Sequence, residues 1–340
     1  MKDVLLASTL HDPRGVFLDA LTKVPEVVLA EYTGWLINVT TTTDQRIKNA
    51  LGSLNPLGVI MTETDPDNPI VPDKIENDHL YLLKQTVGVA RKLRVDKIQY
   101  TDGDRIITAA TYYPGDLQQM ALKASTLLGD NGSYINFRRR PEDYFTHHPP
   151  LVVTEFGSNR LYSAAFGILI DTGSTAHGMS LDVVEEILRR SPQMESVSFP
   201  NPKWLLIAKE SGAAIRSEET QRVLTFETPD QFKDEARERV LEASIRLGLP
   251  ELPTNSPYEK VQQDYRITLG LDSIRSLDEW SLRFNTERQY LTLLRNHLAI
   301  FGYTEEQEDR LFREINRSLA FMERQYSTIT EALKNPSSFE

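Results

Sequence analysis

The chain reads Lys97-Ile98-Gln99-Tyr100-Thr101-Asp102-Gly103-Asp104-Arg105 about a third of the way along its 340 residues. The first four residues predict a strand, and two carboxylates separated by one glycine follow it. At the end of a buried strand, both carboxylates leave the sheet edge toward the crevice where open α/β sheets bind ligands. The glycine between them lets the backbone turn and lets a bulky ligand approach.

The Asp-Gly-Asp unit fits a hard divalent cation. Magnesium keeps several waters and binds through one or two carboxylates plus substrate phosphates, so two aspartates are enough. The alternative is a solvated turn, because acidic turns after strands are common and an Asp-x-Asp pattern alone does not distinguish the two.

The residues around this unit predict an α/β fold with a mostly parallel sheet and flanking helices. Short apolar, β-branched runs alternate with amphipathic stretches. We expect strands at 4–9, 35–40, 57–61, 97–100, 134–138, 166–171 and 223–226. We expect helices at 15–23, 45–54, 74–93, 181–190 and 204–209, with Pro25 closing the first and Asp44 in a polar segment that suits the N-cap of the second.

After Pro229 the strand signal stops, and the C-terminal region reads as helices. Apolar stripes recur at helical spacing in two of them, at positions 280, 284, 291, 294 and 298 and at 311, 315, 319, 322, 326, 329 and 333. Gly302 ends the first of these helices, and Thr304 with Gln307 forms a capping box for the second. We therefore expect two domains, 1–230 and 231–340. The stripes fit a core, and the alternatives are a homodimer seam or an acceptor-binding surface.

Composition excludes several classes of protein. No cysteine occurs, so disulfides, thiol nucleophiles and zinc–thiolate sites are excluded, and any metal is held by oxygen or imidazole. The net charge of −11 disfavours a nucleic-acid partner. No apolar run is long enough to span a bilayer, and the N-terminus reads as a first strand rather than a signal peptide, so we expect a cytoplasmic protein.

Several of these features resemble GT-A glycosyltransferases, which use nucleotide-diphospho-sugars as donors. The strand followed by Asp102-Gly103-Asp104-Arg105 is similar to the Asp-x-Asp site of that family. The run from Asp171 to Ser174, with Gly178-Met179-Ser180 and the helix after it, looks like the family's acceptor loop. Trp204-Leu205-Leu206 and the strand-like residues 212–215 are similar to its closing helix and strand. The likeness covers residues 1–230.

The resemblance implies a hexosyltransferase-like enzyme that moves a sugar from such a donor to a hydroxyl acceptor. It implies that Asp102 and Asp104 hold Mg²⁺ or Mn²⁺ against the donor's diphosphate, where the metal acts as a Lewis acid. Arg105 would pair with phosphate, or else form a salt bridge to a neighbouring carboxylate. The implied nucleotide-binding residues follow the first two strands: Thr9, His11, Asp12, Arg14, Thr40 and Asp44. Loop polarity alone also explains these residues.

One departure from the family concerns the general base. Many members carry an acidic residue just before the tryptophan of the closing helix, whereas this chain reads Pro200-Asn201-Pro202-Lys203-Trp204. Either Asp171, Glu155 or Glu195 supplies the base, or the enzyme is a retaining one that needs none, or the chain is not catalytic. Glu155 lies in a polar block that reads as a loop. His177, in the glycine-containing loop, would contact the acceptor or donor phosphate or complete the metal shell, or it is a plain loop histidine.

Three rival functions stay open. A sugar-phosphate nucleotidyltransferase shares the fold and the metal, but it needs a glycine-rich loop that residues 8–13 do not provide. An aspartyl phosphatase needs its Asp-x-Asp after the first strand. A non-catalytic nucleotide-sugar-binding protein that oligomerises through its C-terminal helices fits the missing carboxylate.

Overall fold

The computed structural model describes residues 2–225, except 14, 16, 66, 68, 130, 145, 146 and 148, together with residues 274–334. These residues group into two compact units. The first unit holds residues 2–140 and 174–225, and the second holds residues 141–173 and 274–334. The expected boundary at residue 230 lies outside the described residues. The expected first domain includes residues 141–173, and instead these residues pack with the C-terminal helices.

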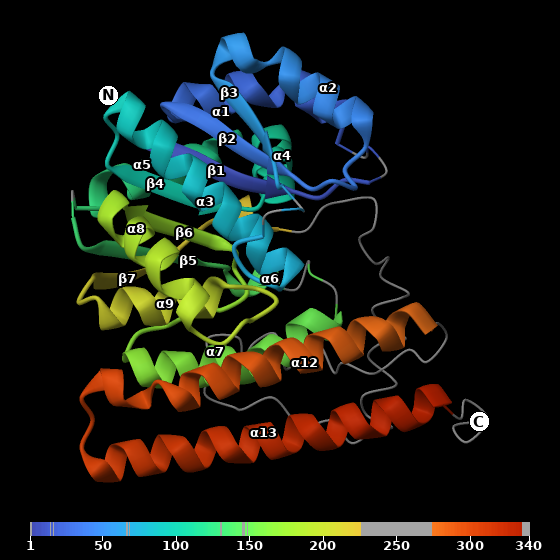
Figure 1. The fold of residues 1–340 in the computed structure, drawn as a ribbon, viewed down its shortest axis with the longest axis vertical. Helices are drawn as coiled ribbons and strands as arrows, with labels where there is room; N and C mark the ends of the chain where they lie inside the picture. Colours follow the sequence, from blue (N-terminus) through green and yellow to red (C-terminus); the bar gives the residue numbers. More distant parts are fainter. Residues whose placement is uncertain are drawn as a thin grey trace. The chain divides into compact units, whose positions relative to one another are not determined.

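The first unit is built on one seven-stranded sheet in the order β3-β2-β1-β4-β6-β5-β7 (Figure 1). Its strands are β1 (Val4–Leu10), β2 (Gly34–Val39), β3 (Val59–Glu63), β4 (Lys97–Thr101), β5 (Ser133–Arg138), β6 (Ala176–Ser180) and β7 (Ala214–Glu219). β6 runs antiparallel to both of its neighbours, and every other pair is parallel. The expected α/β class with a mostly parallel sheet is confirmed.

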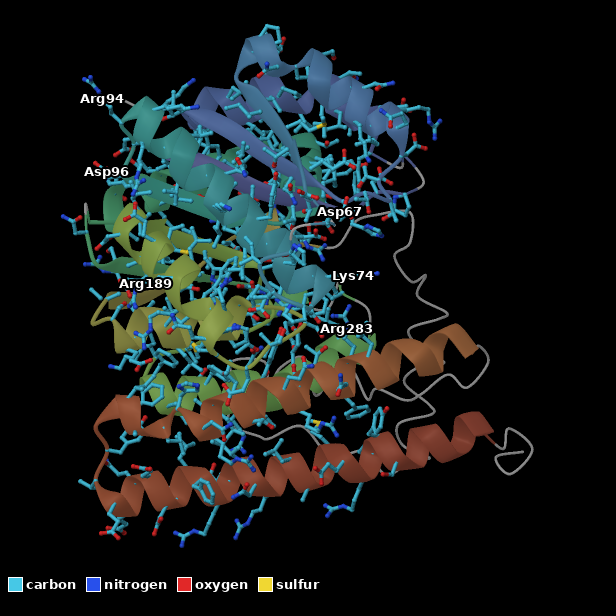
Figure 2. The ribbon with its side chains drawn as sticks, viewed as in Figure 1. Asp67, Lys74, Arg94, Asp96, Arg189 and Arg283 are labelled. Atoms are coloured by element: carbon cyan, nitrogen blue, oxygen red, sulfur yellow. The ribbon has the colours of Figure 1, made fainter. Side chains whose placement is uncertain are left out.

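Helices cover both faces of this sheet. The helices of the unit are α1 (Val24–Glu31), α2 (Gln45–Ser53), α3 (Lys74–Leu93), α4 (Gly103–Tyr112), α5 (Pro114–Leu127), α8 (Leu181–Arg190) and α9 (Asn201–Glu210). α1, α4 and α5 pack on one face, and α3, α8 and α9 pack on the other. Lys74 and Arg94 mark the two ends of α3 in Figure 2. This long helix connects β3 to β4 and packs on β1 and β2.

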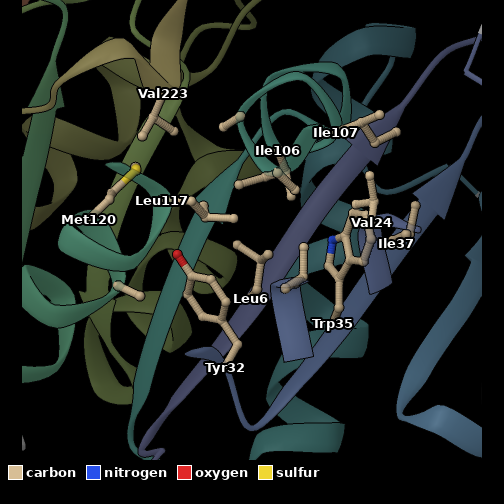
Figure 3. Close-up of a cluster of buried hydrophobic side chains, with 14 of the residues drawn as sticks. Leu6, Val24, Tyr32, Trp35, Ile37, Ile106, Ile107, Leu117, Met120 and Val223 are labelled. Carbon is tan, nitrogen blue, oxygen red and sulfur yellow. The ribbon is translucent and has the colours of Figure 1, made fainter. Parts of the chain in front are cut away.

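One core lies between the sheet and the layer of α1, α4 and α5 (Figure 3). Leu6 of β1, Trp35 and Ile37 of β2, and Ile106 of α4 are all buried in one cluster. Leu5 and Ala7, the alternate residues of β1, are fully buried too, because the second helix layer covers the opposite face. Burial on both faces is the reason that parallel strands read as continuous apolar runs.

The first helix differs from the expectation. Instead of a helix over 15–23 that Pro25 closes, the structure has a single 3-10 turn at Ala20–Thr22 followed by α1, which begins at Val24. Pro25 stands in the first turn of α1, where a missing N–H costs nothing and the fixed φ angle favours the helix. The proline is therefore a start signal here.

The expected strand at 166–171 is also wrong. Residues up to Phe166 belong to helix α7, and Gly167 follows it with a φ of +68°, a left-handed conformation that suits a helix end. Strand β6 lies later, at Ala176–Ser180, where the sequence predicts a glycine loop. Gly178 fits this strand because a Cβ there would lie 3.3–3.4 Å from Leu128, Ile135 and Phe137.

The expected strand at 223–226 is replaced by a 3-10 turn at Arg222–Leu224, and residue 226 lies outside the described residues. The strand of this region is β7, which comes several residues earlier and pairs in parallel with β5. The other expected elements match the structure closely.

The second unit is helical in its described residues. It contains α6 (Pro141–Tyr144), α7 (Pro149–Phe166), α12 (Ile274–Asn296), a 3-10 turn at Leu298–Phe301 and α13 (Glu305–Lys334). Phe284, Leu291 and Leu294 of α12 are buried, as are Leu311, Ile315, Leu319 and Met322 of α13, so these parts of the predicted stripes form a core. Gly302 is left-handed at φ +64°, and Thr304 and Gln307 exchange capping hydrogen bonds as predicted.

No helix in the described ranges is long and apolar enough to cross a membrane.

Candidate functional site at the ends of β1 and β4

The strand order places a topological switch point between β1 and β4. From β1 the chain proceeds outward through β2 to β3, and then returns on the other side of β1 to form β4. Neighbouring parallel strands with connections that lead to opposite faces leave a crevice at their carboxyl ends. Thr9 lies near the end of β1, and Asp102 follows β4 directly, so the Asp-Gly-Asp unit lies at this point of the sheet.

Two hydroxyl groups hold the carboxylate of Asp102. The Tyr100 hydroxyl donates to its Oδ1 at 2.6 Å, and the Thr9 hydroxyl donates to the same oxygen at 3.3 Å. The two hydroxyl oxygens lie 2.9 Å apart. Burial raises the pKa of Tyr100 well above its ordinary value, and the Asp102 charge adds to this, so the tyrosine keeps its proton.

Gly103 begins α4 and lets that helix approach the end of β1. A Cβ at this position would lie 3.0 Å from the Thr9 carbonyl oxygen and 3.2 Å from the Leu10 Cβ. The unit is therefore the N-terminus of a helix rather than a solvated turn. Free N–H groups and the helix dipole make such a terminus favourable for an anion such as phosphate.

Asp104 lies in the first turn of α4, where its Oδ1 accepts a hydrogen bond of 2.8 Å from the Arg105 backbone N–H. Its side chain is 28% exposed. Burial raises the pKa of Asp104; the Arg105 guanidinium opposes this rise, and the Asp102 charge adds to it. A cation between the two carboxylates would relieve their repulsion.

The Arg105 side chain is buried, and its guanidinium contacts other residues of the protein. Its guanidinium Nη1 donates to the Thr225 carbonyl oxygen at 3.2 Å and lies 3.8 Å from Asp104 Oδ2. These contacts match the alternative that the sequence left open for Arg105, an ion pair with a neighbouring carboxylate. Its predicted role in phosphate binding stays a prediction.

The polar residues after β1 and β2 contact one another. His11 Nδ1 lies 2.9 Å from the Thr40 hydroxyl, and the Asp44 backbone N–H donates to the Asp12 carbonyl oxygen at 2.9 Å. The Asp12 carboxylate is buried and accepts a hydrogen bond from the Phe17 backbone N–H. The two loops are thus joined beside the switch point, as predicted. Arg14 lies outside the described residues.

Asp44 serves the helix that follows it. Its carboxylate accepts hydrogen bonds from the backbone N–H of Arg46 at 2.7 Å and from the Arg46 guanidinium at 2.8 Å. These bonds to Arg46 lower the pKa of Asp44 to about 2. The predicted N-cap is confirmed, and a role for Asp44 in nucleotide binding stays a prediction.

His177 does not lie in a loop, contrary to the expectation. It is buried in β6, beside Tyr100 in the sheet register, and its Nδ1 lies 2.8 Å from the Tyr134 hydroxyl. The aromatic rings of Tyr100, His177 and Trp204 pack together, with centroids 5.2–6.3 Å apart. His177 therefore takes part in the core that fixes the Tyr100 ring. Its proposed contacts with substrate stay predictions.

Glu155 and Asp171 belong to the second unit, where both are buried. Glu155 lies on helix α7 rather than in a loop, and a Cβ at Gly173 would overlap its carboxylate, with 2.0 Å to Oε1. Asp171 Oδ1 accepts hydrogen bonds from the Asn159 amide at 3.4 Å and from the Gly173 backbone N–H at 3.3 Å. Asp171 thus takes part in a buried hydrogen-bond network, and the Glu155 carboxylate lies against Gly173.

Sequence reasoning missed two features of the site. Tyr100 precedes Asp102 by two residues, and side chains two residues apart on a strand point to the same face. This spacing was the available signal that the Tyr100 hydroxyl reaches the Asp102 carboxylate. Lys203 is notable in the sequence only because an acidic residue was expected at its position, just before Trp204. It is completely buried, and its Nζ lies 2.5 Å from Glu76 Oε1 of α3, which is equally buried. Burial of a lysine requires such a partner.

Among the residues that the structure describes, no three His, Cys, Asp or Glu side chains are arranged to hold a metal ion by themselves. A cation at Asp102 and Asp104 would thus need other ligands, from water or phosphate.

No family model and no curated protein matches the sequence. Among solved structures, the chain is similar to glucosyl-3-phosphoglycerate synthase from Mycobacterium tuberculosis in complex with uridine diphosphate, with a TM-score of 0.44 and 14% identity over 73% of this chain and 81% of that one. The same synthase with Mn²⁺, uridine diphosphate and phosphoglyceric acid gives a TM-score of 0.44 and 15% identity over 73% and 80% of the two chains. Likeness at this level does not transfer an activity, a metal or a substrate to this chain.

Proposed function

We propose that the chain is a metal-dependent glycosyltransferase that moves a sugar from a nucleotide-diphospho-sugar to a hydroxyl acceptor. The observation that carries this proposal is the Asp102 carboxylate at the switch point of the sheet, held by two hydroxyl donors at the N-terminus of α4. Crevices at such points bind nucleotides, and the N-terminus of a helix favours their phosphates.

The donor set at this edge fits Mg²⁺ or Mn²⁺. Two carboxylates one residue apart, without a third protein ligand in the described part of the chain, suit a cation that takes its remaining ligands from phosphate and water. When bound, such a cation supplies Lewis-acid chemistry that neutralises charge on the departing nucleoside diphosphate. In this scheme Asp102 and Asp104 position the cation, and the first turn of α4 faces the diphosphate.

Metal-assisted donor binding is the property to test. Titration calorimetry with UDP- and GDP-sugars, with and without Mn²⁺, should show donor binding that depends on the metal. Asp104→Asn should abolish the effect of the metal while the circular dichroism spectrum stays unchanged. Asp96→Asn is the matched control, because Asp96 precedes the same strand at the opposite edge of the sheet (Figure 2). Donor binding that ignores Mn²⁺ contradicts the proposal.

A second function has one observation in its favour. The position before Trp204, where the family carries an acidic residue, is a lysine locked in a buried ion pair with Glu76. A chain without a base at this place fits a non-catalytic protein that binds nucleotide-sugars. Sugar release from a donor that binds in a metal-dependent way separates the two: transfer or hydrolysis supports the enzyme, and binding without turnover supports the binding protein.

The proposed partners are the sugar donor and a hydroxyl acceptor. A homodimer through the C-terminal helices is also proposed, and light scattering of the purified chain tests it.

A further inference from the structure

The Tyr100 side chain is held in place on several sides by the core of the first unit. The residue is completely buried, and its ring packs edge-on against Trp204 at 5.2 Å and lies 5.4 Å from the His79 ring. A ring held on several sides cannot move its hydroxyl away from Asp102 without disturbing the core. The 2.6 Å bond is thus set by the packing of the unit.

The hydrogen bonds to Asp102 are unevenly shared between its two oxygens. Oδ1 accepts the short hydrogen bond from the Tyr100 hydroxyl and lies 3.3 Å from the Thr9 hydroxyl, whose single proton also has the Tyr100 oxygen within 2.9 Å. Oδ2 has no hydrogen-bond donor among the residues that the structure describes. Although Asp102 occupies the N-cap position of α4, its side chain makes no capping bond. Oδ1 therefore faces both hydroxyl groups, and Oδ2 is left for a ligand.

We infer that Tyr100 is a positioning residue, which holds Asp102 so that Oδ2 binds the cation. This inference rests on the proposed function, since it assigns a task at the same site. Carboxylates that bind metals are themselves oriented by hydrogen bonds from surrounding residues, and loss of such a partner typically costs about 10- to 100-fold in metal affinity. Thr9 has the same task in a weaker form, because its bond to Asp102 is longer.

Two buried tyrosines give a matched pair of variants. Tyr134, like Tyr100, is completely buried on a neighbouring part of the sheet, but its hydroxyl pairs with His177 rather than with a carboxylate. Tyr100→Phe and Tyr134→Phe each remove one buried hydroxyl and keep the ring. Mn²⁺ affinity is read from the electron paramagnetic resonance signal of free Mn²⁺, in the presence of UDP.

Tyr100→Phe should weaken Mn²⁺ binding by roughly 10- to 100-fold, while Tyr134→Phe should leave it within about threefold of wild type. UDP binding without metal should not change in either variant, a split that general damage to the fold would not produce. Equal losses in both variants, or no loss in Tyr100→Phe, overturn the inference.

A second pair covers the case in which Tyr100→Phe does not fold. Thr9→Val removes the hydroxyl with little change of shape, and Thr9→Ser keeps it. Thr9→Val should lose Mn²⁺ affinity and Thr9→Ser should retain it; equal affinity in the two overturns the inference.

Failure of the inference differs from failure of the proposed function. If Asp102→Asn abolishes Mn²⁺ binding and Tyr100→Phe does not, the metal site stands and the role of Tyr100 falls. If Asp102→Asn binds Mn²⁺ as wild type does, both fall together.

Discussion

Asp44 and Asp102 are the N-cap residues of the helices that follow two parallel strands, β2 and β4, and they have different roles. Each precedes a helix as its N-cap residue, and their backbone angles agree closely, with φ −52° and ψ 135° for Asp44 and φ −54° and ψ 140° for Asp102. Asp44 caps its helix and pairs with Arg46, whereas Asp102 makes no capping bond and is held by Tyr100 and Thr9. The same local conformation therefore caps a helix after β2 and leaves the carboxylate without a capping bond after β4.

We expect the largest effect from Asp102→Asn, which changes the N-cap residue that makes no capping bond. The neutral amide cannot replace a carboxylate as a ligand for a hard cation, so Mn²⁺-dependent nucleotide binding should be lost. The thermal midpoint should hardly change, because the side chain caps no helix. Calorimetric titration and a melting curve measure the two effects. A variant that melts early but keeps the metal would mean that Asp102 is structural, as Asp44 is.

Gly103→Ala tests whether the close packing of α4 against β1 is needed for stability and for Mn²⁺ binding. The new Cβ would meet the Thr9 backbone at 3.0 Å, so we expect a loss of about 1–3 kcal/mol in unfolding free energy together with weaker Mn²⁺ binding. Gly88→Ala is the control: Gly88 lies within α3, and a Cβ added there would have no atom within 4 Å, so this variant should gain about 0.5–1 kcal/mol. Urea unfolding measures both. Equal behaviour of the two variants would show that Gly103 is not needed for close packing.

Glu287, in the second unit, is a buried carboxyl group inside a helix rather than at its N-cap. Burial raises the pKa of Glu287 of α12 well above its ordinary value; Ser158 and Arg283 oppose the rise, and the charge of Glu155 adds to it. Tyr162 and Tyr290 lie close by. A pKa raised in the folded state contributes stability that is complete below the unfolded value and is lost as the pH rises through the folded value.

The thermal midpoint of the wild type should therefore fall relative to that of Glu287→Gln as the pH increases from about 5 toward about 9. The glutamine cannot ionise, so its midpoint should depend less on pH. Parallel curves for the two proteins would show that Glu287 does not govern the change.

Asp44→Ala should have the smallest effect. Its pKa is lowered to about 2 by Arg46, so its contribution is present above the unfolded value near 3.8 and is lost as the pH falls toward 2. At pH 7 the variant should melt slightly earlier than wild type, because α2 loses its cap. Its affinity for Mn²⁺ should equal that of wild type, and a loss there would place Asp44 in the ligand site.

The sheet was largely predictable where its strands are buried along most of their length, as β1, β2, β4 and β5 are. β1 and β2 are largely apolar runs, and that composition favours a parallel sheet. The position of Asp102 at the end of β4 followed from the same pattern.

Three features were not predictable from local sequence. The polar block around Glu155 forms helix α7 because Ser158 and Asn159 find buried hydrogen-bond partners in Thr172, a contact that only the tertiary structure supplies. β6 contains a glycine that close packing demands, and glycine otherwise indicates a loop. Lys203 reads as a surface residue until α3 brings Glu76 beside it.

The discontinuous make-up of the second unit has a consequence for how the chain is synthesised. α7 ends at Phe166, whereas α12, which packs on it, begins at Ile274. At about 5–20 residues per second, a ribosome needs roughly 5–20 s to translate the interval. During that time all strands of the first unit are available, but α12, which packs on α7 where Phe156, Leu161 and Tyr162 are buried, has not yet been made. The second unit can therefore complete this described core only after α12 and α13 have been synthesised.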